Sequence, residues 1–269
     1  MVVEDLDLEL RAKLGYSDIP QNKVTIIYVP GLGTMGGASK KIALTHKRLL
    51  QRGMDLNVVN FTYKSHLGKV LSGFENDSKD LSEIVKRLED MGIPRDKIGL
   101  FSVCYGSHVA SQFLSENKGI GFAIMVEPYL GTNSLRRSLR GMASLAKYAL
   151  RSVRLPKIPI GHRYDGNGYI DVQSFVENDG VNIDFNDDGV PILTLITKVH
   201  WFINPNYYLN PETKSHTVVL VDTQKISKTA LNNFYGRIYQ FLAEIYSPEV
   251  LRPTTYSNSK TLSETLQAH

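Results

Sequence analysis

Cysteine is scarce in this sequence, because Cys104 is the only one among 269 residues. A single cysteine excludes an intrachain disulfide framework and a zinc site of the usual thiolate kind. No apolar run approaches the roughly 18 residues that span a bilayer. Residues 1–14 are rich in Asp and Glu and have no apolar core of signal-peptide length, so no signal peptide is expected. We therefore expect a soluble protein of a reducing, cytoplasmic compartment.

A strong charge of either sign is also missing. Lys and Arg exceed Asp and Glu only slightly, which gives a net charge of +4. Such a balance does not indicate a nucleic-acid partner. The length and the 42% hydrophobic content suit one α/β domain with an insertion.

Short apolar runs rich in β-branched residues alternate with helical patterns along most of the chain. The expected strands cover 24–29, 56–61, 98–103, 121–126, 191–196 and 217–221. Helices are expected over 42–50, 77–91, from 107 onward and over 227–246. This alternation predicts an α/β fold with a mostly parallel sheet of about six strands and helices on both faces. Residues 1–127 and 190–246 would form this core, with an insertion over 128–189 and a polar tail over 247–269.

Cys104 falls at the junction between the third strand and the following helix. The strand pattern ends at Val103, and apolar residues at helical spacing begin after Ser107. The residues two positions before and after the cysteine, Ser102 and Gly106, are small. A sharp turn with a strained central residue requires small neighbours, because larger side chains would collide there.

This stretch resembles the nucleophile elbow of the α/β-hydrolase superfamily, G-x-S-x-G, with Cys104 in the serine position. A cysteine there is similar to the dienelactone hydrolases and the polyhydroxyalkanoate synthases, and residues 62–68 are similar to the family loop D-Y-R-G-H-G. The resemblance implies a Cys104 nucleophile at a helix N-terminus, which favours the thiolate. It also implies an oxyanion hole formed by the backbone N–H groups of Tyr105 and Leu32, in a loop with Gly31 and Gly33. A buried structural cysteine, and a glycine loop that only ends a strand, are the alternatives.

The rest of the expected triad departs from the family pattern. In the family a histidine follows the last strand, but here no histidine lies between His216 and the C-terminal residue. A substitute set combines Cys104 with His200, which follows the fifth strand, and with Glu127, which follows the fourth. A cysteine that is already partly ionised needs less help from a base than a serine does. A structural role for His200 stays open.

Other residues complete the candidate site. Asp222, after the last strand, is a second residue that could orient a base, and His66 is expected at the rim of the pocket. His108 lies one helical turn beyond the cysteine and is expected to contact it, to pack or to cap. We expect no cofactor. We also expect no metal ion: residues 184–189 match the opening of a calcium-binding loop, but the twelfth position, where such a loop needs Glu, is Leu195.

Acidic residues are absent from positions 128–164, and this span is basic. Its basic side chains include Arg136, Arg137, Arg140, Lys147, Arg151, Arg154 and Lys157. Most of them share one side of a helix over 131–157, with an apolar stripe on another side. We interpret this segment as an amphipathic cap helix. Its basic face would be solvated, would bind an anionic substrate such as a phosphopantetheine carrier, or would contact an anionic membrane surface.

Two hypotheses of function follow. The chain is an enzyme that hydrolyses or transfers acyl groups of esters or thioesters through a Cys104 acyl intermediate, with a small-molecule acyl substrate. Alternatively, it is an inactive binding protein that keeps the α/β-hydrolase fold. The intact elbow favours the enzyme, and the missing histidine favours the binding protein.

Overall fold

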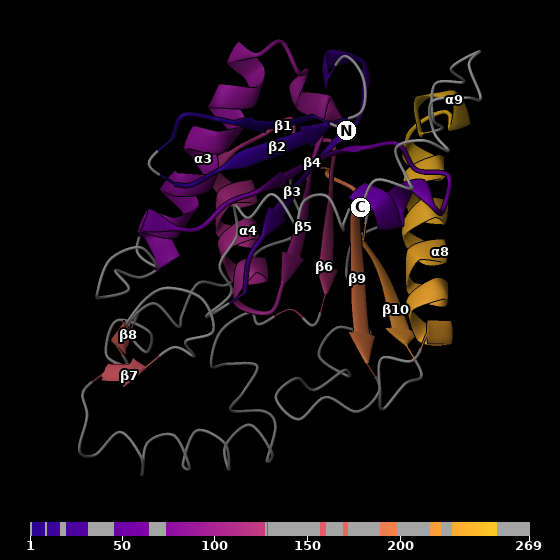
Figure 1. Ribbon diagram of the computed structural model, residues 1–269. Coiled ribbons are helices and arrows are strands. Elements are labelled where there is room, and N and C mark those ends of the chain that lie inside the picture. The colour runs from indigo at the N-terminus through magenta and orange to yellow at the C-terminus, as the bar shows by residue number, and fades with distance from the viewer. Residues whose placement is uncertain are drawn as a thin grey trace, which may run out of the picture.

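A central sheet with helices on both faces organises the chain (Figure 1). The computed structural model describes residues 2–8, 10–16, 20–31, 46–64, 74–126, 128, 157–159, 169–171, 189–197, 216–221 and 228–251. The strands of the main sheet are β1 (Val2–Asp5), β2 (Lys13–Tyr16), β3 (Thr25–Val29), β4 (Asn57–Asn60), β5 (Ile98–Val103), β6 (Phe122–Val126), β9 (Ile192–Thr197) and β10 (His216–Val221). The helices include α3 (Phe74–Asp90), α4 (Tyr105–Glu116), α8 (Lys228–Ile245) and α9 (Pro248–Leu251), with short 3-10 turns at Pro20–Asn22 and Arg95–Lys97. Residues 46–50 are also helical, within the helix expected over 42–50, whose first residues lie outside the described ones.

The sheet has eight strands in the order β1-β2-β4-β3-β5-β6-β9-β10. All neighbours from β4 to β10 pair in parallel. The six predicted strands are confirmed, and each observed strand lies within one or two residues of its expected bounds. Consecutive strands joined by crossover segments produce this parallel order, as the alternating pattern predicts.

The two additional strands come from the N-terminal segment. β1 and β2 form a short antiparallel hairpin, and β2 extends the sheet by pairing antiparallel with β4. The predicted sheet of about six strands is thus present, and this hairpin adds two strands whose four residues are too few to give a clear alternating pattern.

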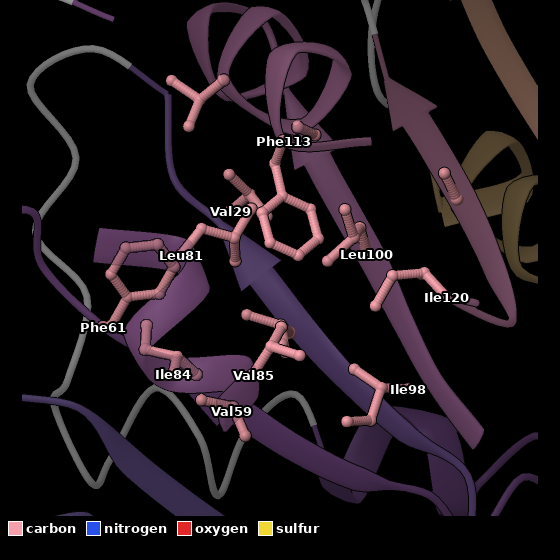
Figure 2. Packing of buried hydrophobic residues seen from close by; sticks show 14 of the residues in the cluster. Val29, Val59, Phe61, Leu81, Ile84, Val85, Ile98, Leu100, Phe113 and Ile120 are labelled. Carbon is pink, nitrogen blue, oxygen red and sulfur yellow. The ribbon is translucent and has the colours of Figure 1, made fainter. Parts of the chain in front are cut away.

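Alternate side chains of the parallel strands enter two separate cores. One core lies between the sheet and the helices α3 and α4, and it includes Val29, Leu100, Val85 and Phe113 (Figure 2). The other lies between the opposite face of the sheet and α8, where Phe122 packs edge to face on Phe241. Helices thus cover both faces (Figure 1), so the ends of the strands remain as the place for a site.

Between residues 128 and 189, the elements that the structure describes are a small antiparallel pair, β7 (Lys157–Pro159) and β8 (Tyr169–Asp171). The cap helix expected over 131–157 lies outside the described residues, apart from Lys157, which begins β7. The tail expected from 247 contains the short helix α9, and the backbone N–H of Asp55 donates to the carbonyl of Leu251 at 2.8 Å. Among the helices described, none has the length and apolar character needed to traverse a membrane.

Candidate active site at the carboxyl end of the sheet

The topology marks one place on the sheet where a site can form. The chain passes from β3 to β4 on one side, and from β5 to β6 on the other, so β3 and β5 are neighbours whose connections leave in opposite directions. At such a switch point the loops after the strands separate and leave a crevice. The residues that follow β3 and β5 are Pro30 and Gly31 on one strand and Cys104 on the other.

Cys104 occupies a strained turn between β5 and α4. Its backbone has φ 52° and ψ −115°, which a residue with a side chain rarely adopts. The cysteine remains in the ladder on one side, because its N–H donates to the carbonyl of Val126 at 3.0 Å. On the other side its carbonyl accepts from the N–H of Ser107 at 3.0 Å, in the first turn of α4. The side chain is partly exposed.

A positive φ alone does not distinguish this position. Asp7 and Arg11 also have positive φ, but they lie in the connection between β1 and β2 at the edge of the sheet. Among the described residues, only Cys104 combines a strained backbone with a nucleophilic side chain at the switch point. The combination, rather than the strain, makes Cys104 the centre of the candidate site.

Glycines permit the tight approach of the segments around the cysteine. A Cβ atom on Gly106 would lie 2.3 Å from the carbonyl oxygen of Val29 and 2.8 Å from that of Pro30. A Cβ atom on Gly31 would lie 3.0 Å from the carbonyl oxygen of Val103 and 3.8 Å from the Cβ of Cys104. The start of α4 therefore packs directly on the end of β3, and Gly31 lies beside the cysteine.

Ser102 takes the position where the family motif has its first glycine. Its side chain is buried, and its Oγ lies 3.0 Å from the Oγ of Ser107 and donates to the carbonyl of Ile124 at 3.3 Å. The extra hydroxymethyl group is accommodated by these hydrogen bonds, which join β5 to α4 and β6.

Tyr105 extends the site into the helix layer. It is the first residue of α4, its side chain is 3% exposed, and its hydroxyl donates to Oδ2 of Asp77 at 2.5 Å. Burial, and secondarily the Asp77 carboxylate, raise the pKa of Tyr105 well above its usual value, so the phenol is protonated and acts as the donor. Asp77 itself is buried in the first turn of α3.

A second buried tyrosine supports the loop after β3. The hydroxyl of Tyr63 donates to the carbonyl of Pro30 at 3.1 Å. Its ring meets the ring of Tyr105 edge to face, with 6.1 Å between centroids. Burial raises the pKa of Tyr63 well above its usual value, so it too is a neutral donor.

Two titratable groups near this network have shifted pKa values. Burial raises the pKa of Asp80 to about 6, although this carboxylate accepts the backbone N–H of Lys64 at 2.7 Å. Burial lowers the pKa of His108, in α4, to about 4, so its imidazole is neutral at physiological pH. His108 is fully buried in the helix, consistent with packing there.

The structure describes three of the predicted site residues. Gly31, Cys104 and Tyr105 lie together at the carboxyl end of the sheet. The other predicted residues lie outside the described residues, namely Leu32, Gly33, His66, Glu127, His200 and Asp222. Within the described ranges, no three His, Cys, Asp or Glu side chains gather as a metal site would require.

The parallel strand order, the two helix layers and the strained turn after β5 together define the α/β-hydrolase fold. Comparison with solved structures agrees. An esterase of Pyrococcus furiosus is 20% identical, with a TM-score of 0.58 over 87% of each chain. The α/β hydrolase GrgF of a Penicillium species is 13% identical, with a TM-score of 0.58 over 87% of this chain and 93% of that one. The mouse α/β hydrolase domain-containing protein 10 is 13% identical, with a TM-score of 0.60 over 91% of this chain and all of that one.

These similarities concern the fold. No family model matches the sequence, and no curated protein matches it. The activity of this chain therefore has to be argued from its own residues.

The network around Asp77 was not predicted from the sequence. Asp77 was expected only as the start of a helix, which in fact begins three residues earlier at Phe74. The one available signal was Tyr63, which lies in the loop similar to D-Y-R-G-H-G. A carboxylate in the first turn of a helix is common, so its contact with the residue after the cysteine has no local signature.

Proposed function

We propose that the protein cleaves or transfers the acyl group of an ester or thioester through a covalent acyl intermediate on Cys104. The observation that carries this proposal is the strained, partly exposed position of Cys104 at the start of α4. Such strain costs on the order of 1–3 kcal/mol and is found mostly at functional sites. The likeness in fold to an esterase of Pyrococcus furiosus supports hydrolytic chemistry.

The reaction would proceed in two steps. The thiolate of Cys104 attacks the acyl carbon, a C–S bond forms, and the carbonyl electron pair moves to the oxygen. Backbone N–H groups of Tyr105 and Leu32 would stabilise this oxyanion. When it collapses, the bond to the alkoxide or thiolate leaving group breaks, and the leaving group takes up a proton. Water or another nucleophile then attacks the acyl carbon, loses its proton and releases the Cys104 thiolate.

The proton transfers require a base, for which His200, oriented by Glu127, is the proposed residue. The thiol lies at a helix N-terminus, where the helix dipole and the N–H groups of the first turn favour the thiolate. Cys104 therefore depends less on a base than a serine would. The acid-free basic segment 128–164 supports an anionic acyl donor, such as an acyl phosphopantetheine.

A binding protein without catalytic activity is the second candidate. It is favoured by one observation, the absence of a histidine between His216 and the C-terminal residue. In that case the elbow would survive as part of the scaffold and the thiol would not turn over.

The chemistry of the thiol separates the two candidates. The protein would be treated with iodoacetamide from pH 5 to 9, and separately with p-nitrophenyl acetate or an acyl phosphopantetheine, with intact mass as the readout. We expect fast alkylation below neutral pH, protection by the acyl donor, and an acyl adduct that Cys104→Ala does not form. If acyl phosphopantetheine, which is anionic, gives more acyl adduct than the neutral p-nitrophenyl acetate, that result would support the proposed substrate class.

Two variants test the mechanism further. Cys104→Ser is expected to be nearly inactive, since a hydroxyl needs a stronger base than a thiol does. His200→Ala should slow turnover by roughly 10²- to 10⁴-fold if His200 is the base. An unreactive thiol up to pH 9 in folded protein, with no acyl adduct, would overturn the enzymatic proposal and leave the binding protein.

A further inference from the structure

The residue after Cys104 connects the candidate site to a buried network in the helix layer. The backbone N–H of Tyr105 is the donor that the proposed reaction needs, while the side chain of the same residue is held by Asp77 through a 2.5 Å hydrogen bond. Both side chains are buried, so bulk water does not compete for this bond. The position of the Tyr105 peptide is thus coupled to a carboxylate on α3, a helix that packs against α4.

The segment that precedes the second proposed donor, Pro30–Gly31, contacts the same network from the other side. Tyr63 donates to the carbonyl of Pro30 at 3.1 Å, and the next residue, Gly31, lies beside Cys104. The ring of Tyr63 contacts the ring of Tyr105 edge to face. The two tyrosines therefore brace both backbone segments from which oxyanion donors are proposed, and each contacts the other.

We propose that Asp77 is a positioning residue for the oxyanion hole. Its carboxylate fixes the Tyr105 side chain and hence the N–H at the start of α4, and through the ring contact with Tyr63 it supports the Pro30–Gly31 segment. Asp77 does not touch the substrate in this role. The inference rests on the proposed function, because an oxyanion forms only if Cys104 attacks an acyl group.

Two reagents separate this role from a merely structural one. Alkylation of Cys104 by iodoacetamide displaces iodide and develops no oxyanion, whereas acylation by p-nitrophenyl acetate passes through one. A variant that misplaces the oxyanion donors should slow acylation and leave alkylation nearly unchanged. The ratio of the two rates, measured on the same folded protein, is therefore the readout.

The variants are Asp77→Ala, Asp77→Asn and Tyr105→Phe. Asp77→Ala and Tyr105→Phe are expected to lower the acylation rate by about 10- to 100-fold, somewhat less than the loss of a donor itself. Alkylation should change less than about twofold. Asp77→Asn retains an acceptor oxygen and should recover part of the loss, and it serves as the test if Asp77→Ala does not fold.

A matched control is available in Tyr246. Burial raises the pKa of its phenol as well, and its hydroxyl donates to the carbonyl of Asp96 at 2.5 Å, just before β5 and so at the other end of that strand. Tyr246→Phe likewise removes a short hydrogen bond of a tyrosine hydroxyl, here to a backbone carbonyl, and should leave the ratio of acylation to alkylation unchanged. An equal ratio in wild type, Asp77→Ala and Tyr105→Phe would overturn the positioning role alone. Absence of acylation in the wild type would overturn the proposed function, and this inference with it.

Discussion

The central sheet buries polar and charged side chains at both ends, but in different settings. At the amino end, before β3 and β4, Lys23 forms a buried ion pair with Asp55, and Nε2 of His46 lies 3.5 Å from the second oxygen of that carboxylate. At the carboxyl end, Asp77 accepts from a tyrosine instead. There the backbone is strained at Cys104 and the segments approach closely.

The comparison separates two uses of buried polarity. A buried lysine, carboxylate and histidine would suggest a functional cluster if burial and charge were the only criteria. In the amino-end cluster, however, the lysine is paired with the carboxylate, and the cluster contains neither a residue at positive φ nor a thiol. The carboxyl end has both. We therefore assign structural importance to the first region and propose reactivity only for the second.

The largest expected effect on stability comes from breaking the amino-end pair. Asp55→Ala would leave the Lys23 ammonium buried without this counter-charge, which should lower the free energy of unfolding by about 3 kcal/mol or more. Urea denaturation followed by circular dichroism measures this loss. In molecules that remain folded, the rate of Cys104 alkylation should equal that of wild type.

The double variant Lys23→Met with Asp55→Leu is the matched control. It removes both charges and should lose less stability than Asp55→Ala alone, because no charge of the pair remains buried. A folded Asp55 variant with altered thiol reactivity would show that the two ends of the sheet are coupled and would break the comparison.

A somewhat smaller loss is expected from filling the close approach at the carboxyl end. Gly106→Ala would place a methyl group 2.3 Å from a backbone oxygen of β3, which can only move with its strand. We expect a loss of about 2 to 3 kcal/mol in the same denaturation experiment, together with slower acylation of Cys104.

Gly236→Ala serves as its control, because a Cβ atom there meets nothing within 4 Å and the residue is exposed in α8. Helix propensity should make that variant slightly more stable. If Gly106→Ala were as stable as Gly236→Ala, the tight packing of α4 on β3 would be refuted.

The sequence was sufficient for the core of the fold because its signals are local. Runs such as Ile98–Val103 and Phe122–Val126 are mostly apolar, as is typical of strands buried on both faces, and the structure confirms them. The hairpin of β1 and β2 has strands of four residues with partly exposed positions, and its pairing with β4 bridges about 40 residues of chain. Pairing between such distant segments cannot be recognised from the local sequence of either strand.

The candidate site also has a part that local sequence predicts and a part that it does not. Cys104 and its small neighbours were predicted because the turn imposes a spacing of two residues on either side. The Asp77–Tyr105 bond joins positions 28 apart on two helices, and the Tyr63–Pro30 bond joins positions 33 apart. The first contact depends on how α3 and α4 pack, and the second on how the segments after β3 and β4 lie, neither of which the sequence pattern specifies.

The smallest expected effect concerns Asp80, a carboxylate beside the Tyr63–Tyr105 network. Its folded-state pKa of about 6 exceeds the ordinary value of 3.8, so the folded protein binds this proton more tightly than the unfolded chain. The resulting contribution to stability is fully present below about pH 4 and is lost as the pH rises through 6. Asp80→Asn stays neutral and can still accept the Lys64 N–H, so it should be more stable than wild type at pH 7, by about 1 kcal/mol.

His108 changes the pH dependence of stability in the opposite direction, over a pH range that overlaps that of Asp80. Its folded-state pKa is lowered to about 4, so its contribution is present above about 6.5 and is lost on acidification. The wild-type curve contains both effects, and only the difference between wild type and Asp80→Asn isolates the carboxylate. Urea unfolding at pH 4, 5, 6 and 7 should show the two proteins equal at pH 4 and progressively different above it. Curves that stay parallel would show that the pKa of Asp80 is the same in the folded and unfolded states, and that burial does not penalise its charge.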